Sequence, residues 1–144
     1  MLVYDPATNP LNTNEWAFPL TECIHIASMA MSIGMIVAVD LRLLGRGIPG
    51  RSAAQLLRDT ELWTLIGFIL VITSGLVIFT TDPAMYLRNI SFQAKMALLI
   101  AGLVFNYTIH RKAALSGSGG IVVALVSLAL WMSLVFSAIF IAFV

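Results

Sequence analysis

Four long apolar stretches dominate the pattern of hydrophobic and polar positions along the chain. A helix needs about 20 mainly apolar residues to cross the hydrocarbon layer of a membrane. Stretches of about that length run over residues 17–44, 62–80, 92–111 and 121–144. Because the connections between them are short, consecutive helices should run antiparallel. The pattern therefore predicts an all-α fold, an integral membrane four-helix bundle of up-down topology, as a single membrane domain over residues 1–144.

Polar and helix-breaking residues fill the segments between these stretches. Residues 1–15 are rich in Pro, Asn and Thr and predict a surface arm. The first loop, residues 45–61, contains several Gly and Pro breakers and a short amphipathic piece at 52–58. We expect a brief interfacial helix at 84–89. The run SGSGG at 116–120 predicts a short flexible linker.

Composition supports a membrane protein. The 144 residues are 60% hydrophobic and 10% charged, whereas soluble domains carry roughly a quarter charged residues. The net charge of +1 gives no reason to expect a nucleic acid partner. Cys23 is the single cysteine, which excludes an internal disulfide. Because so short a chain buries little internal surface, we expect a homo-oligomer or a subunit of a larger membrane complex in the lipid bilayer.

The basic residues predict the orientation in the membrane. Cytoplasmic loops carry an excess of Lys and Arg. One side of the predicted bundle has only Arg88 and Lys95. The other side carries Arg42, Arg46, Arg51, Arg58, Arg111 and Lys112. We therefore expect both termini on the non-cytoplasmic side of a bacterial inner membrane.

Two of the predicted spans carry a stripe of polar residues. Ionisable groups at membrane depth are costly and usually face the bundle interior or water. On the first span, an arc of about 60° contains Glu22, His25, Met29 and Asp40. On the third span, an arc of about 80° contains Lys95, Gly102, Asn106 and His110. We predict that the two stripes face one another.

Depth along the helices divides these residues into two layers. We expect an outer cluster of Glu22, His25 and Lys95. We expect an inner, structural polar cluster of Asp40, Arg42 and His110, with Asn106 at a similar depth. In one interpretation, these groups form pairs that only hold helices together, such as Glu22–Lys95, Asp40–Arg42 or Asp40–His110.

In a second interpretation, His25 binds a cofactor. A neutral imidazole ligates the iron of haem b or a transition metal such as copper, and a nearby carboxylate, here Glu22, can orient it. His110 lies at a different depth and should not share one iron with His25. The sixth coordination position of the iron would be filled by Met132, by another side chain or by a residue of a second protomer, or it would stay empty. Two haems, one in each leaflet, and a metal site of Glu22, His25 and Met29 are alternatives.

The first span also carries a family resemblance. The run TECIHIASMAMSIGMIVAVDLRLLG, residues 21–45, resembles small bacterial inner-membrane proteins of unknown function through E-x-x-H followed by D-L-R-L-L-G. Residues 63–111 continue the likeness. The resemblance implies a four-helix membrane fold and supplies no activity. It points to Glu22, His25, Asp40, Arg42 and Lys95. A weaker likeness in shape to copper-resistance and b-type cytochrome membrane proteins favours redox or metal chemistry.

Three hypotheses for the function follow. The first is a haem-binding protein that moves electrons between the quinone pool and a partner, with Lys95 or Arg88 meeting haem propionates. The second is a membrane module that binds or transports a metal ion or small molecule through the same outer cluster. The third is a structural subunit of a larger membrane complex, in which the polar stripes only hold helices together. Because the sequence shows no phosphate-binding loop and no nucleophile with its base, we expect an electron-transfer or binding protein rather than an independent enzyme.

Overall fold

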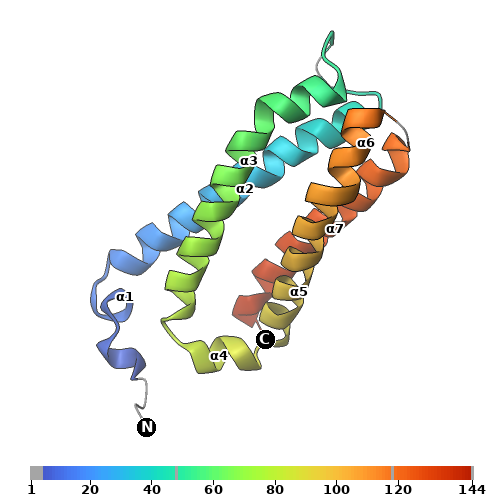
Figure 1. The fold of residues 1–144 in the computed structure, drawn as a ribbon. Helices are drawn as coiled ribbons and strands as arrows, with labels where there is room; N and C mark the ends of the chain where they lie inside the picture. Colours follow the sequence, from blue (N-terminus) through green and yellow to red (C-terminus); the bar gives the residue numbers. More distant parts are fainter. Residues whose placement is uncertain (1–4, 48, 118, 144) are drawn as a thin grey trace.

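The computed structural model describes residues 5–47, 49–117 and 119–143. Within these residues, the chain forms four long antiparallel helical spans packed as an up-down bundle, as predicted (Figure 1). The spans are α2 (Ala17–Leu43), α3 (Ala53–Phe79), a continuous third span, and α7 (Gly120–Phe140). The third span joins α5 (Ile90–Phe105), η2 (Asn106–His110) and α6 (Arg111–Ser116). Short helices complete the fold: η1 (Pro6–Thr8), α1 (Pro10–Thr13), α4 (Pro83–Arg88) and η3 (Ile141–Phe143).

Helix α3 starts nine residues before the second apolar stretch, at Ala53 rather than at residue 62. The amphipathic piece expected inside the first loop is the first part of α3. A capping box fixes this start, because Ser52 Oγ accepts from the Gln55 backbone N–H at 3.1 Å and Gln55 Oε1 accepts from the Ser52 N–H at 2.9 Å. Such a box satisfies two backbone donors that the helix itself leaves free. The helix therefore extends beyond its apolar part and includes Glu61.

The third span contains a π-helical turn at Asn106–His110. A π turn holds an extra residue and shifts the faces of the residues that follow it relative to those before it. Asn106 and His110, at the two ends of this turn, are both buried. The span continues to Ser116 and ends at Gly117, whose φ of +69° requires the left-handed conformation that glycine adopts freely.

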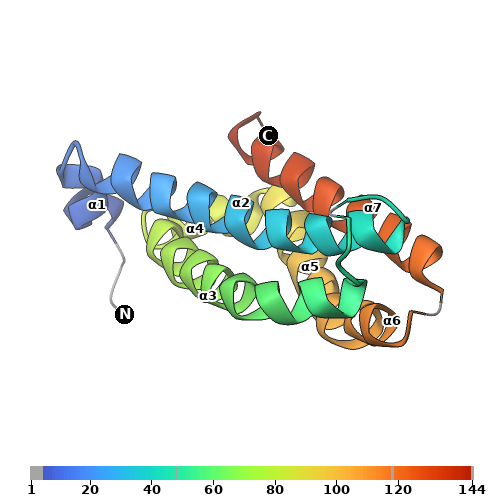
Figure 2. The ribbon, with the colours of Figure 1, turned by 90° about the horizontal axis from the view of Figure 1, so that it is seen from above.

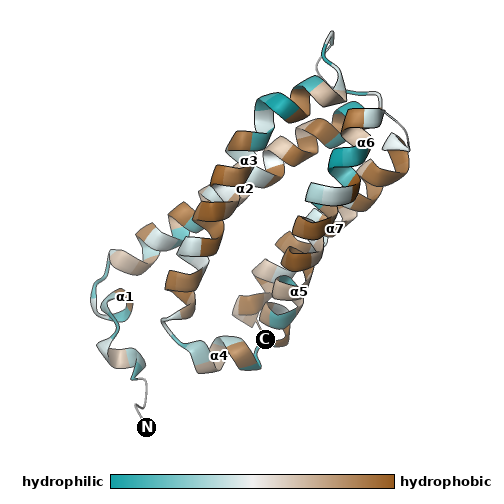
Figure 3. Ribbon diagram, viewed as in Figure 1, coloured by the Kyte–Doolittle hydropathy of each residue, from teal (hydrophilic) through white to brown (hydrophobic). Residues whose placement is uncertain are grey.

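The outer surface of the bundle is apolar. All four spans are long and apolar enough to cross a membrane, and less than a third of the most apolar stretch of each is buried inside the protein. Large side chains such as Leu20, Ile100 and Phe136 are exposed, and Figure 3 shows hydrophobic colour along the middle of every span. Lipid is the solvent that such a surface requires. The protein is a multi-pass membrane protein.

Packing in the interior brings opposite helices together. Helix α2 packs against α3 and α7, and α5 packs against α7 (Figure 2). The rings of Phe68 on α3 and Trp131 on α7 stack with centroids 5.4 Å apart. The indole also lies against Gly102 on α5, where a Cβ would come within 3.1 Å of it. The Trp131 indole therefore joins α3, α5 and α7 in the interior of the bundle.

The two ends of the bundle differ. The terminal end carries α1, α4 and η3 (Figure 1). There the Asn9 and Asn12 amides donate to the carbonyls of Thr80 and Thr81, at 2.8 and 3.0 Å. The basic end carries the α2–α3 and α6–α7 connections, with most of the Arg and Lys residues. The Asn9 and Asn12 hydrogen bonds hold the described part of the N-terminal arm against the end of α3.

Close approach of α2 and α3 depends on Gly67. A Cβ at this position would lie 2.1 Å from Ser32 Oγ and 3.0 Å from the Ser28 carbonyl oxygen. Ser32 Oγ donates across the same contact to the Thr64 carbonyl at 3.1 Å. Small residues at membrane helix contacts allow this proximity and these hydrogen bonds.

We predict that Gly67→Ala lowers stability by about 1–3 kcal/mol, because the new methyl group separates the two helices or displaces the Ser32 hydroxyl. The matched control is Gly34→Ala on α2, where nothing lies within 4 Å of the new Cβ. Alanine is the better helix former, so this control should be neutral or slightly stabilising. Unfolding in detergent measures the stability of both variants. Equal unfolding midpoints for Gly67→Ala and Gly34→Ala would contradict the role of Gly67.

Candidate functional site: two histidine clusters

The first candidate site is the His25 cluster, which consists of His25 on α2, Ser74 on α3 and Lys95 on α5. His25 Nδ1 lies 2.9 Å from Ser74 Oγ, and His25 Nε2 lies 3.4 Å from Lys95 Nζ. His25 and Lys95 are half-buried, and Ser74 is buried. The imidazole also lies against Gly75, where a Cβ would come within 3.0 Å of its Cε1. Three helices thus meet at this ring, nearer the terminal end.

The hydrogen bonds define the tautomer of His25. The Ser74 hydroxyl donates its only proton to the Leu70 carbonyl at 2.5 Å, so its oxygen accepts from His25 Nδ1–H. A Lys ammonium can only donate, so His25 Nε2 accepts from Lys95. The imidazole is therefore neutral, with its Nε2 lone pair directed into the bundle. This is the state in which histidine ligates a metal.

Two residues expected beside His25 lie elsewhere. Glu22 is exposed on α2, and Met132 on α7 is 49% exposed. Both side chains therefore face outward, and of the expected outer cluster the structure brings together His25 and Lys95. Within the described residues, no three His, Cys, Asp or Glu side chains come together as metal ligands.

The second candidate site is the His110 cluster, which consists of Asp40 on α2 with Asn106 and His110 in the π turn. His110 Nε2 lies 2.7 Å from Asp40 Oδ1, and the two side chains are only 1% and 0% exposed. A carboxylate only accepts, so Nε2–H donates to it. This pair crosses the bundle as the two polar stripes predict.

Several polar atoms of this cluster are buried without a partner in the described part of the chain. They include Asp40 Oδ2, His110 Nδ1 and Asn106 Oδ1. Most buried polar atoms in proteins have a partner, so such a group requires an explanation. Arg42, expected to pair with Asp40, donates instead through Nε to the Arg51 carbonyl. This hydrogen bond connects the end of α2 to the following loop.

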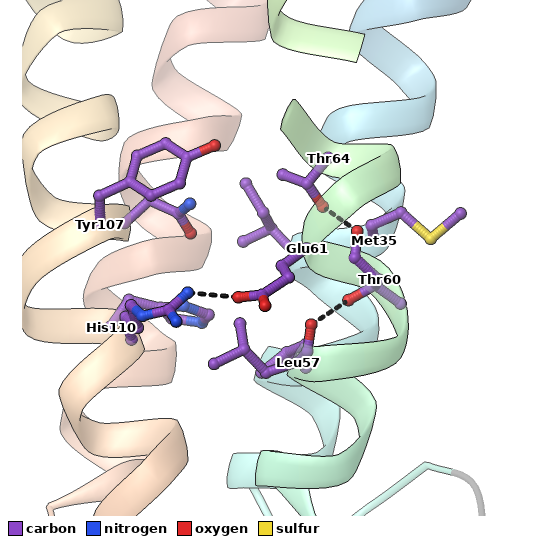
Figure 4. Close-up of a pocket in the computed structure, with 11 residues that line it drawn as sticks. Met35, Leu57, Thr60, Glu61, Thr64, Tyr107 and His110 are labelled. Atoms are coloured by element: carbon purple, nitrogen blue, oxygen red, sulfur yellow. Dashed lines mark hydrogen bonds and ion pairs between the residues drawn. The ribbon is translucent and has the colours of Figure 1, made fainter. Parts of the chain in front are cut away.

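A hollow lies beside His110 between α2, α3 and the π turn (Figure 4). Arg111 and Glu61 form an ion pair at this hollow, with side chains 43% and 38% exposed. Tyr107 also lines it. The apolar pattern predicts a loop at Glu61, so this residue was not expected at a site. The motif Ser52-x-x-Gln55 was the available signal, since it predicts a helix start that puts Leu57, Glu61 and Thr64 on one face.

Comparison of the chain with known protein families, with curated proteins and with solved structures finds no match in any of the three. The family resemblance of the first span stays a prediction. Fold and site together define the class: a multi-pass membrane four-helix bundle with two histidine clusters in its interior.

We predict that Asp40→Leu and His110→Leu each destabilise the protein by about 3–5 kcal/mol, because each leaves one buried polar partner unpaired. The double variant should recover much of that loss, since both groups are then replaced by apolar ones. Unfolding of the two single variants and the double variant in detergent gives the double-mutant cycle for the pair. Additive losses from the two Leu variants would contradict direct coupling.

We predict a smaller effect at the ion pair of Glu61 and Arg111. Glu61→Gln breaks this half-exposed pair and should lower stability by less than about 1 kcal/mol, measured by the same unfolding experiment.

Proposed function

We propose that the protein is a b-type haem-binding electron-transfer protein of the bacterial inner membrane, with His25 as the iron ligand. The observation that carries the proposal is the placement of His25, whose Nδ1 lies 2.9 Å from Ser74 Oγ and whose Nε2 faces Lys95 across the bundle at 3.4 Å. A ligating histidine usually donates its other N–H to a protein acceptor, which fixes the ring and raises its basicity. Haem, when bound, supplies one-electron redox chemistry.

Of the expected ligands, His25 is the one side chain placed to hold the haem. Lys95 must leave Nε2, which its flexible four-carbon side chain allows, and its ammonium is then available to neutralise a propionate. Met132 is exposed and His110 is held by Asp40 in the other layer. A sixth ligand would therefore come from a second protomer, or that position stays open. That second protomer would belong to a homo-oligomer or to a larger membrane complex in the bilayer.

The proposal includes the orientation of the protein in the membrane. With the basic end in the cytoplasm, His25 lies nearer the non-cytoplasmic face, as the distribution of Arg and Lys predicts. Electrons would then pass between the membrane quinone pool and a redox partner.

A second candidate function is a binding or transport module for a metal ion or small molecule, without haem. The contact of Lys95 with His25 Nε2 favours it, because an ammonium already satisfies the lone pair that iron requires. In that case the His25 cluster, where the sequence predicts the binding site, is only a polar contact between helices, and we propose the His110 cluster as the binding site instead.

We expect the purified protein to show a Soret band and sharp α and β bands after reduction with dithionite. His25→Ala should lose these bands, because the ligand is removed. His110→Gln, in the other layer, is the control and should keep them. Visible spectra of folded proteins measure this, and a featureless wild-type spectrum after haem addition would rule out the proposal.

Ser74→Ala tests how His25 is positioned. The variant removes the acceptor of Nδ1–H, so the ring becomes a less basic ligand. We expect the bands to remain and the reduction potential to rise, because ferric iron is less stabilised. Thr73→Ala is the control, since that hydroxyl is exposed and bonds to its own helix. Redox titration gives both potentials; equal values would mean that Ser74 does not act on the iron ligand.

A further inference from the structure

A groove at the basic end of the bundle has no part in either histidine cluster. It lies between the connection of α2 to α3 and the start of α7, and its volume is about 590 Å³. Ligand sites commonly have volumes of about 300–1,000 Å³. We propose that this groove binds the headgroup of an anionic phospholipid, with Arg42 as the residue that binds the phosphate. This binding is independent of haem.

Three long helices meet at the groove. Gly120 at the start of α7 lies against Leu43 at the end of α2, where a Cβ on Gly120 would come within 3.1 Å of Leu43 Cδ2. Arg42 on α2 and Ser52, which caps α3, also line the groove. The connections from α2 to α3 and from α6 to α7 lie at this same end of the bundle (Figure 1). Residues far apart in the sequence thus form one surface at the helix ends.

The guanidinium of Arg42 is held in place but keeps most of its donors. Arg42 is half-buried, and its Nε donates to the Arg51 carbonyl. A guanidinium has N–H donors on its two terminal nitrogens as well. Those of Arg42 have no hydrogen-bond partner in the part of the chain that the structure describes. Such a fork of donors matches two oxygens of a phosphate group.

No acidic side chain neutralises Arg42. The chain has seven Asp and Glu residues, all within the described ranges. Those toward the basic end are bonded to other residues, in the pairs Asp40–His110, Asp59–Arg51 and Glu61–Arg111. The rest lie toward the terminal end, at positions 5, 15, 22 and 82. The counter-ion of Arg42 must therefore come from outside the chain.

The first turn of α7 adds backbone donors to the groove. The N-cap of α7 is Gly119, which has no side chain to accept from the first N–H groups of the helix. These groups belong to Gly120, Ile121 and Val122, which line the groove. N–H groups at the start of a helix favour an anion. The charge of Arg42 sets the preference for an anion, and the N–H groups strengthen it.

Apolar residues on α7 favour a phospholipid over a soluble phosphate. Ile121 and Val122 are 61% and 68% exposed at the groove, and Leu125 and Val126, one turn further, are exposed too. Because α7 is apolar from its first turn, the groove lies where the hydrocarbon layer meets the headgroups. An acyl chain can follow these side chains while its phosphate stays in the groove. A zwitterionic headgroup fits less well, since no acidic residue lines the groove to meet its cation.

The test is native mass spectrometry of the whole protein in detergent, titrated with dioleoyl phosphatidylglycerol or dioleoyl phosphatidylcholine. We expect one phosphatidylglycerol molecule per chain to bind at least about tenfold tighter than phosphatidylcholine. An excess of glycerol 1-phosphate should leave the lipid bound, because it lacks the acyl chains. Equal affinities for the two lipids would overturn the proposal. Displacement of the lipid by glycerol 1-phosphate would identify a soluble phosphate as the ligand and also contradict it.

A pair of arginine variants places the lipid. Arg42→Gln removes the charge in the groove and should lower the affinity for phosphatidylglycerol at least about tenfold. The matched control is Arg58→Gln, which removes the same charge from an exposed position on α3 outside the groove. It should change the affinity less than about twofold. Equal losses in the two variants would mean that the lipid responds only to the overall charge of this end.

A second pair leaves Arg42 and its bond to the loop intact. Ser52→Asp puts a carboxylate at the groove, whereas Ser52→Asn puts a neutral amide of the same size there. Asp, Asn and Ser all cap helices well, so α3 should start as before in both variants. We expect Ser52→Asp to bind phosphatidylglycerol at least about fivefold more weakly than Ser52→Asn does. Equal binding by the two folded variants would place the lipid elsewhere and contradict the proposal.

Discussion

The bundle depends on one constraint: a polar side chain within a membrane must find its partner inside the protein, because lipid offers none. Here the constraint is met by histidines that join α2 to the third span across the interior. His110 binds Asp40 almost without exposure, and His25 lies between Ser74 and Lys95. These contacts set the rotation of α2 and the third span about their own axes, since turning either helix would direct an ionisable group into lipid.

The two clusters satisfy the constraint to different degrees. The His25 ring has a partner at each nitrogen, so a ligand there must displace Lys95. In the His110 cluster, Asp40 Oδ2, His110 Nδ1 and Asn106 Oδ1 are buried without a partner among the described residues, beside a small hollow. The clusters lie in different layers, His25 toward the terminal end and His110 toward the basic end.

Sequence patterns were sufficient for part of the candidate site. The helical periodicity of the polar residues predicts that the stripes face each other, and the pairs His25–Lys95 and Asp40–His110 agree with that prediction. Helical periodicity predicted the wrong neighbours for two residues whose side chains have other partners within reach. Glu22 is exposed, and Arg42 reaches a loop carbonyl. A long side chain, or one near the end of a helix, can reach water by changing its rotamer. The angular position of a residue around the helix does not show this.

The sequence by itself determined the membrane class, the four spans and the up-down order, because apolar length is fixed by the thickness of the hydrocarbon layer. It also determined which residues are costly to bury. Only the tertiary structure decided that Ser74 fixes the His25 tautomer, that a π turn holds both Asn106 and His110 in the interior, and that Glu61 and Arg111 lie beside the same hollow. The physical reason is that these features depend on how separate helices meet: a hydrogen bond between helices or a local change of helical pitch leaves no periodic signal in the sequence of any one helix.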